Sequence, residues 1–309
     1  MSLKNKSVMV TGGAGFIGSH LIDTLIKEEP EEIIALCNFS LGKEENLREA
    51  LSAFPKLKII KASLANFDEC KKIFEENNVD VVFNLAVVTL LASLDKPAWS
   101  VKENIDMITT VCELQRLGKF QRLIHFSSSE AYGTARFVPM KEDHPLVPET
   151  PYAAAKAAAD HVVGSYARTF KTDSTVVRPF NNYGPRQHAG KYAAIIPLTI
   201  GKIMRGEPVT INGDGNQTRD FIFVKDTADA AVQIAKSQST AGRTINVASG
   251  RETTMNRVVE LILQEFDYKE KIEHREARPG DVRRHFADVS LAKELIGWQP
   301  KTRFEDGIK

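Results

Sequence analysis

A glycine-rich segment near the N-terminus constrains the fold of this chain more than any other feature. Residues 11–18 read Thr-Gly-Gly-Ala-Gly-Phe-Ile-Gly, directly after an apolar run at 8–10 and at the start of an amphipathic stretch that continues to residue 27. Glycines without side chains let backbone N–H groups approach a pyrophosphate, and the N-terminus of the following helix faces the negative charge. The order of strand, glycines and helix therefore predicts a dinucleotide-binding unit.

Strand-like and helix-like segments alternate after this turn. Short apolar runs with the length and composition of buried parallel strands lie at 8–10, 33–36, 57–60, 81–83, 123–126 and 174–177. Amphipathic stretches lie at 68–77 and 152–170, and the second can begin with Thr150 as N-cap and Pro151 in its first turn. This alternation predicts an α/β fold with a Rossmann-type doubly wound parallel sheet and right-handed crossovers.

The alternation stops near residue 178, and turn-rich segments such as 181–185 and 212–216 follow. We expect residues 1–178 to form the dinucleotide-binding Rossmann domain. Residues 179–309 are expected to form mainly a smaller, discontinuous substrate lobe. A strand candidate at 244–247 is predicted to return from this lobe to the main sheet.

Composition argues against several classes of protein. The net charge of +1 gives no bulk attraction to nucleic acid or to a membrane surface. The chain has no apolar run of about 18 residues, and its N-terminus leads straight into the first predicted strand. Its three cysteines are too far apart for a disulfide framework or a metal site. We therefore expect a cytoplasmic protein with no metal and no nucleic-acid or membrane partner.

The end of the second predicted strand bears on the choice of cofactor. Dinucleotide-binding folds place an acidic residue about 20 residues after the glycines to hold the ribose hydroxyls. Here the strand ends in Cys37, Asn38, Phe39 and Ser40, with no carboxylate. Asn38 and Ser40 can hydrogen-bond a ribose without charge, and the nearest cation is Lys43. We expect NAD, with NADP the less favoured cofactor.

Tyr152 and Lys156 are the predicted catalytic pair. They lie four residues apart on one predicted helix, so their side chains share a face. An ammonium group beside a phenol stabilises the phenolate, which can take a proton from a sugar hydroxyl while hydride leaves for the cofactor. Ser128, Ser129 and Glu130 follow the 123–126 strand, at the edge where ligands sit in such sheets.

The turn, the serine-rich strand end and the Tyr-x-x-x-Lys spacing together resemble the extended short-chain dehydrogenase/reductase family. The match covers nearly the whole chain and includes segments at 177–186, 213–226 and 278–281 that are similar to the family's nucleotide-sugar loops. The resemblance implies an NAD-dependent nucleotide-sugar epimerase or dehydratase that forms a homodimer. Two departures stand out: Cys37 and Asn38 replace the usual acidic residue, and Ser63 stands where an aspartate often contacts adenine.

The resemblance assigns two sets of contact residues. Those expected at the cofactor are Gly12, Gly15, Phe16, Ile17, Asn38, Ser40, Ser63, Leu64, Leu85, Ala86, Ser127, Tyr152, Lys156 and Pro179. Those expected at the substrate are Val88, Asn181, Arg186, Val209, Ile211, Arg219, Arg278 and Asp281. Arg219 and Arg278 suit a diphosphate because a guanidinium fork matches phosphate oxygens, and a short strand at 209–211 would pack beside the base.

The segment at 128–130 most resembles nucleotide-hexose 4,6-dehydratases, because epimerases of this type commonly carry small residues at the position of Glu130. We expect C4 oxidation by Tyr152 and NAD, with Ser128 on the same oxygen. Glu130 would then remove the C5 proton, and Ser129 or Glu130 would protonate the leaving C6 hydroxyl. Return of the hydride to C6 completes the predicted reaction on UDP-N-acetylglucosamine or a related nucleotide hexose.

Four other functions stay open at this point. The same residues could release a 5,6-ene sugar, or could carry out 4-epimerisation, which has no use for Glu130. Decarboxylation of UDP-glucuronate would need a cation for the substrate carboxylate, for which Arg186 and Lys191 are candidates. A non-catalytic dinucleotide sensor would need neither Tyr152 nor Lys156.

Overall fold

The computed structural model describes residues 1–190, 193–269, 272–277 and 282–309. Its centre is a seven-stranded sheet in the order β11-β6-β5-β4-β1-β2-β3, in which every neighbouring pair is parallel. The strands are β1 (Ser7–Thr11), β2 (Glu32–Cys37), β3 (Leu57–Lys61), β4 (Val81–Asn84), β5 (Arg122–Phe126), β6 (Asp173–Pro179) and β11 (Thr244–Val247). The predicted doubly wound α/β fold is confirmed.

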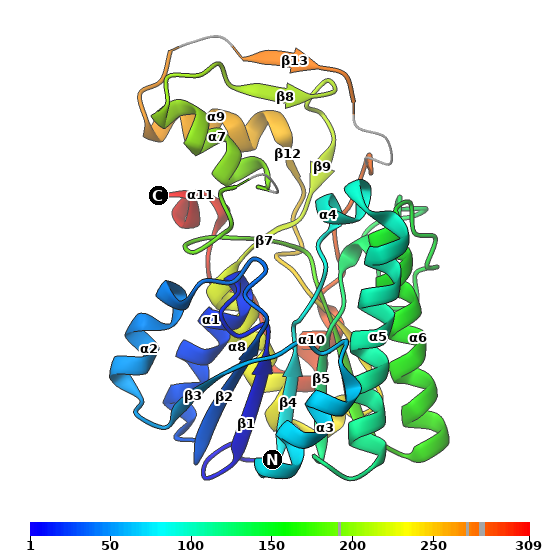
Figure 1. Ribbon diagram of the computed structural model, residues 1–309. Helices are drawn as coiled ribbons and strands as arrows, with labels where there is room; N and C mark the ends of the chain where they lie inside the picture. The colour runs from blue at the N-terminus through cyan, green and yellow to red at the C-terminus, as the bar shows by residue number, and fades with distance from the viewer. Residues whose placement is uncertain (191–192, 270–271, 278–281) are drawn as a thin grey trace.

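Helices cover both faces of this sheet (Figure 1). The helices before β6 are α1 (Phe16–Leu25), α2 (Arg48–Ala53), α3 (Phe67–Glu76), α4 (Leu90–Asp95), α5 (Pro97–Arg116) and α6 (Pro151–Phe170). Alternate strand residues enter different cores, because successive side chains of a strand point to opposite faces. Val8 and Val10 pack in the core that contains Leu21 of α1, whereas Met9 packs with Val111 of α5.

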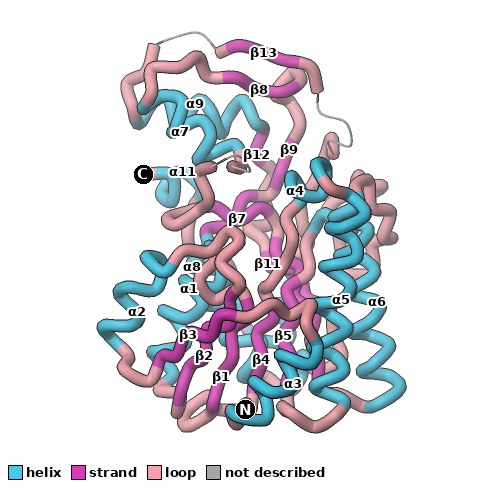
Figure 2. Tube along the Cα trace, viewed as in Figure 1, coloured by secondary structure: helices cyan, strands magenta, loops and turns pink. Residues whose placement is uncertain are grey.

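The upper part of the molecule consists of short strands and helices from separated segments (Figure 2). Its short strands are β7 (Asn181–Tyr183), β8 (Thr210–Asn212), β9 (Thr218–Arg219), β10 (Phe221–Phe223), β12 (Thr253–Thr254) and β13 (Glu273–Arg275). The later helices of the chain are α7 (Ile195–Met204), α8 (Val224–Lys236), α9 (Met255–Glu265), α10 (Ser290–Ile296) and α11 (Phe304–Ile308). β11 pairs with β6, so the chain returns to the main sheet at 244–247.

The sheet order reverses direction between β1 and β4. In open α/β sheets, ligands bind beyond the carboxyl ends of the strands at such a switch point. The upper lobe stands over this edge (Figure 1). Within the described ranges, no helix is long and apolar enough to cross a membrane.

Candidate active site

The glycine turn joins β1 to α1 with the geometry that a phosphate-binding turn requires. Gly12 has a φ of +67°, and its N–H donates to the carbonyl oxygen of Leu36 at 2.8 Å. A Cβ on Gly15 would lie 2.9 Å from the carbonyl oxygen of Gly12, and one on Gly18 would collide with the same atom. Glycine at these positions therefore lets the turn pack tightly against the start of α1, and the N-terminus of a helix attracts an anion.

A cavity of about 780 Å³ runs along the carboxyl edge of the sheet from this turn. Its volume and mixed lining suit a large ligand such as a dinucleotide. Of the residues predicted at the cofactor, those that line it are Gly12, Gly15, Phe16, Ile17, Asn38, Ser40, Leu64, Leu85, Ala86, Ser127, Tyr152, Lys156 and Pro179. Ser63 is not among the described lining residues, and its hydroxyl accepts a hydrogen bond from the N–H of Ala65 at 3.3 Å.

The end of β2 forms one wall of this cavity without a carboxylate. Cys37 and Asn38 both line it, and the Cys37 sulfur lies 3.0 Å from the N–H of Ala14 in the glycine turn. Burial raises the pKa of the Cys37 thiol, so this group is neutral at physiological pH. The side-chain oxygen of Asn38 accepts from the N–H of Ser40 at 3.0 Å, and the amide N–H₂ of the same side chain is a hydrogen-bond donor.

A buried hydrogen-bonded chain lies behind the turn. The Thr11 hydroxyl donates to the side-chain oxygen of Asn84 at 2.7 Å and accepts from the N–H groups of Leu85 and Ala86. The Asn84 amide nitrogen lies 3.1 Å from Nδ1 of His125, whose pKa burial holds well below its usual value. No sequence motif predicted these hydrogen bonds, because the pairing of β1, β4 and β5 brings the three side chains together.

Tyr152 and Lys156 lie in the first two turns of α6 and line the cavity. Thr150 caps that helix as predicted, since its hydroxyl accepts from the N–H of Ala153 at 3.2 Å. Burial raises the pKa of Tyr152 to about 12, against a hydrogen bond with Ser128 that lowers it. Burial lowers the pKa of Lys156 to about 8, and its ammonium group donates to the carbonyl oxygen of Phe126 at 2.7 Å.

A buried ion pair lies one helical turn beyond Lys156. Nε of Arg178 donates to one carboxylate oxygen of Asp160 at 2.8 Å, and a second guanidinium nitrogen lies 2.8 Å from the same oxygen. The same guanidinium group lies over the ring of Tyr132, 4.6 Å from its centroid. The charge of Asp160 opposes the fall in the pKa of Lys156 that burial causes. These residues were not predicted, because the contact joins α6 to β6 with no local motif.

Ser129 and Glu130 occupy a short 3₁₀ turn that spans Ser129–Tyr132. The Ser128 hydroxyl caps this turn by accepting from the N–H of Glu130 at 3.2 Å. Ser129 is buried, with its backbone against the ring of His285, whose pKa burial lowers to about 3. Glu130 is partly exposed, and its carboxylate contributes to the raised pKa of Tyr152. Neither belongs to the described lining of the large cavity.

The predicted substrate residues divide into three groups. Val88 and Arg186 line the cavity. Asn181, Val209, Ile211 and Arg219 do not belong to its described lining, and Val209 and Ile211 are buried in the core of the upper lobe. Arg278 and Asp281 lie outside the described residues, as does Lys191.

Two of the predicted arginines have protein partners. Arg186 donates to the carboxylate of Asp23 at 2.7 Å, and a second nitrogen lies 3.4 Å from Glu49. Arg219 donates to the carbonyl oxygen of Thr218 at 2.9 Å. A substrate anion bound by either guanidinium group would therefore compete with these protein contacts for the N–H donors. Among the residues that the structure describes, no cluster of histidine, cysteine or carboxylate side chains could hold a metal ion.

The chain is similar to known proteins over nearly its whole length. The family model for GDP-mannose 4,6 dehydratase matches residues 9–309. A UDP-glucose 4-epimerase from Mycolicibacterium smegmatis is 33% identical over 302 residues, which cover 97% of this chain and 95% of that protein.

Solved structures show the same likeness. A UDP-N-acetylglucosamine 4-epimerase from Methanobrevibacter ruminantium, in complex with UDP-N-acetylmuramic acid, is 36% identical with a TM-score of 0.90, covering 99% of this chain and 96% of that one. A dTDP-glucose 4,6-dehydratase from Streptomyces venezuelae with NAD bound is 27% identical with a TM-score of 0.91, covering 98% and 94% of the two chains.

Proposed function

We propose that this chain, which belongs to the nucleotide-sugar epimerase and dehydratase family of GDP-mannose 4,6 dehydratase, is a nucleotide-sugar 4,6-dehydratase. It is an enzyme of that family and its cofactor is NAD. The substrate that we propose is UDP-N-acetylglucosamine or a related nucleotide hexose, in keeping with the 36% identity to a UDP-N-acetylglucosamine 4-epimerase.

The proposal rests on Glu130. Burial first, and then the carboxylate of Glu130, raise the pKa of Tyr152, so this carboxylate is close enough to the phenol to act on it electrostatically. Oxidation at C4 and re-reduction need only Tyr152, Lys156 and Ser128. A second proton acceptor beside them has a use when the C5 proton must also be removed.

The residues of this chain carry the proton transfers. Bound in the cavity beside the glycine turn, NAD would supply the hydride acceptor for C4 and the hydride donor for C6. The Tyr152 phenolate accepts the proton of the C4 hydroxyl, and the positive charge of Lys156 favours that phenolate. Ser128, already hydrogen-bonded to Tyr152, holds the C4 oxygen as it becomes a carbonyl.

Elimination of water follows from the acidity of C5 beside the new ketone. Glu130 accepts the C5 proton, and the C6 hydroxyl leaves as water once it has been protonated. We assign the delivery of that proton to Glu130 itself, because Ser129 is buried whereas Glu130 is partly exposed. After reduction at C6, C5 takes a proton from solvent, and the Tyr152 phenol releases to solvent the proton that it took from the C4 hydroxyl. Because the C4 ketone is not reduced, the product keeps its 4-keto group.

A nucleotide-sugar 4-epimerase is the second candidate. The observation in its favour is the 33% and 36% identity to epimerases that act on UDP-sugars. Decarboxylation of UDP-glucuronate has less support, because its candidate cation Arg186 is paired with Asp23 at 2.7 Å and Lys191 lies outside the described residues.

A screen of nucleotide sugars by mass spectrometry tests the proposal. The purified enzyme is incubated separately with UDP-N-acetylglucosamine, UDP-glucose, dTDP-glucose, GDP-mannose and UDP-glucuronate. We expect one hexose substrate to lose the mass of one water. An unchanged mass with an inverted C4 centre would establish the epimerase instead, and loss of carbon dioxide from UDP-glucuronate would establish the decarboxylase.

A further inference from the structure

The wall of the cavity beside the glycine turn carries no negative charge at the position where such folds place one. Cys37 is the last residue of β2, it lines the cavity, and its sulfur contacts the N–H of Ala14. It therefore occupies the place of the acidic residue that holds the ribose hydroxyls of NAD in dinucleotide-binding folds. The residues that follow, Asn38 and Ser40, line the same wall and are neutral.

We infer that this wall accepts a 2′-phosphate, so that the protein binds NADP as well as NAD. A carboxylate at the end of β2 discriminates between the two cofactors in two ways: it accepts hydrogen bonds from the ribose hydroxyls, and it repels a 2′-phosphate at short range. The neutral thiol of Cys37 provides neither effect, so little free energy separates the two cofactors at this position.

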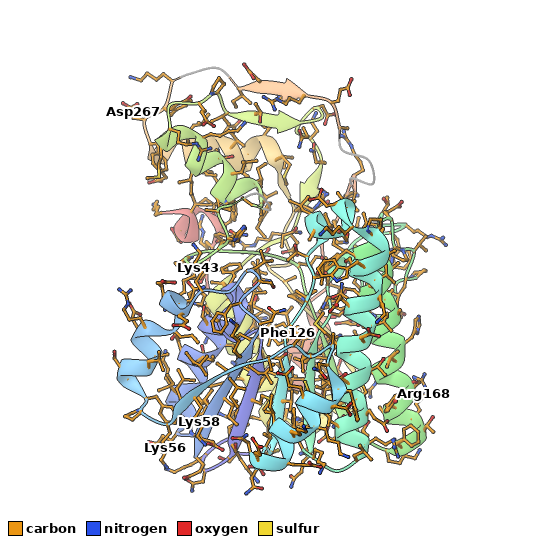
Figure 3. The ribbon with its side chains drawn as sticks, in the orientation of Figure 1. Lys43, Lys56, Lys58, Phe126, Arg168 and Asp267 are labelled. Atoms are coloured by element: carbon orange, nitrogen blue, oxygen red, sulfur yellow. The ribbon has the colours of Figure 1, made fainter. Side chains whose placement is uncertain are left out.

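Among the described lining residues at 36–46, the charged one is positive. Lys43 lines the cavity, and Figure 3 shows it at the carboxyl edge of the sheet, whereas Lys56 and Lys58 lie at the opposite end. Lys61, the last residue of β3, is the register partner of Cys37. Lys61 is not in the described lining, so Lys43 is the cation that would attract a 2′-phosphate at the ribose site.

The acidic residues of the described lining lie elsewhere. They are Asp95 of α4 and Glu103 of α5, which follow β4 on the other side of β1. Ser63, after β3, is neutral as well, so the described wall formed by the ends of β2 and β3 has no carboxylate within it. The inference concerns only the cofactor site, so its test does not depend on the reaction proposed above.

Binding measurements on a matched pair of variants test the inference. Cys37→Asp and Cys37→Asn introduce side chains of almost the same shape, of which only the aspartate is charged. Dissociation constants for NAD and for NADP are measured by isothermal titration calorimetry on wild type and both variants, after bound nucleotide has been removed. We expect wild type to bind NADP within about tenfold of NAD, and Cys37→Asp to widen that ratio by a further tenfold or more while Cys37→Asn does not.

A second substitution keeps the test decisive if a charge at the buried position 37 prevents folding. Asn38 is exposed and lines the same wall, so Asn38→Asp places a carboxylate there without burying it. It should also weaken NADP binding relative to NAD, although by less. NADP binding more than about a hundredfold weaker than NAD in wild type would overturn the inference. Equal ratios in Cys37→Asp and Cys37→Asn, with Asn38→Asp unchanged, would do the same.

Discussion

The ion pair between Asp160 and Arg178 provides a quantitative test of how the catalytic helix is held. The two side chains are only 4% and 5% exposed, and two guanidinium nitrogens contact one carboxylate oxygen at 2.8 Å. Asp160→Asn keeps the shape of the side chain but leaves a buried positive charge without its counter-charge. Breaking a buried pair in this way costs about 3–5 kcal/mol, a large part of the total stability of about 5–15 kcal/mol that is typical of folded proteins.

The same substitution acts on Lys156. Burial lowers the pKa of this lysine to about 8, and the charge of Asp160 is the influence that raises it. Because the group loses its positive charge as the pH rises through its pKa, we expect kcat/KM of wild type to decline above about pH 8. Removing the charge of Asp160 lowers the pKa of Lys156 further, so the decline should begin at a lower pH in Asp160→Asn.

Urea unfolding followed by circular dichroism gives the stability change, and kcat/KM measured across pH gives the second effect. The double variant Asp160→Leu/Arg178→Met is the control, because it removes both charges at similar volume and should recover most of the lost stability. A cost below about 1 kcal/mol for Asp160→Asn would contradict the assignment of a buried charge pair. A double variant less stable than the single one would contradict it as well.

Three further substitutions test other parts of the site. Gly18→Ala places a methyl group against the carbonyl oxygen of Gly12, so NAD affinity by calorimetry should fall at least about tenfold, and unchanged affinity would show that the turn can move. Thr150→Ala removes the cap bond to Ala153 and should cost about 1 kcal/mol in urea unfolding; no cost would mean that the cap contributes nothing. Tyr152→Phe should lower kcat by about 10²–10⁴ while NAD still binds, and wild-type turnover would exclude the tyrosine as base.

The main sheet could be predicted because each of its strands carries a local signal. The apolar runs at 33–36 and 81–83 became β2 and β4, and Thr150 marked the start of α6, since strand composition and helix capping depend on neighbouring residues. The family resemblance also led to NAD as the cofactor, which the comparisons confirm.

The contacts that complete the site could not be predicted in this way. Thr11 and Asn84 are 73 residues apart, and the contact between them depends on the pairing of β1 with β4. Arg186 carries a charge suited to a substrate anion, and only its position opposite Asp23 shows that its donors are already used. Ser129 is adjacent to Ser128 in sequence, yet the 3₁₀ turn buries one hydroxyl-bearing residue and leaves the other in the cavity.

The position of solvent deuterium in the product tests most directly whether Glu130 removes a proton from C5. The reaction is run in D₂O with wild type and with Glu130→Gln, and the products are examined by mass spectrometry and nuclear magnetic resonance. We predict that the wild-type product has lost one water and carries deuterium at C5. Glu130→Gln should still reduce bound NAD but form no dehydrated product. A wild-type product inverted at C4 with no deuterium on carbon would contradict the account.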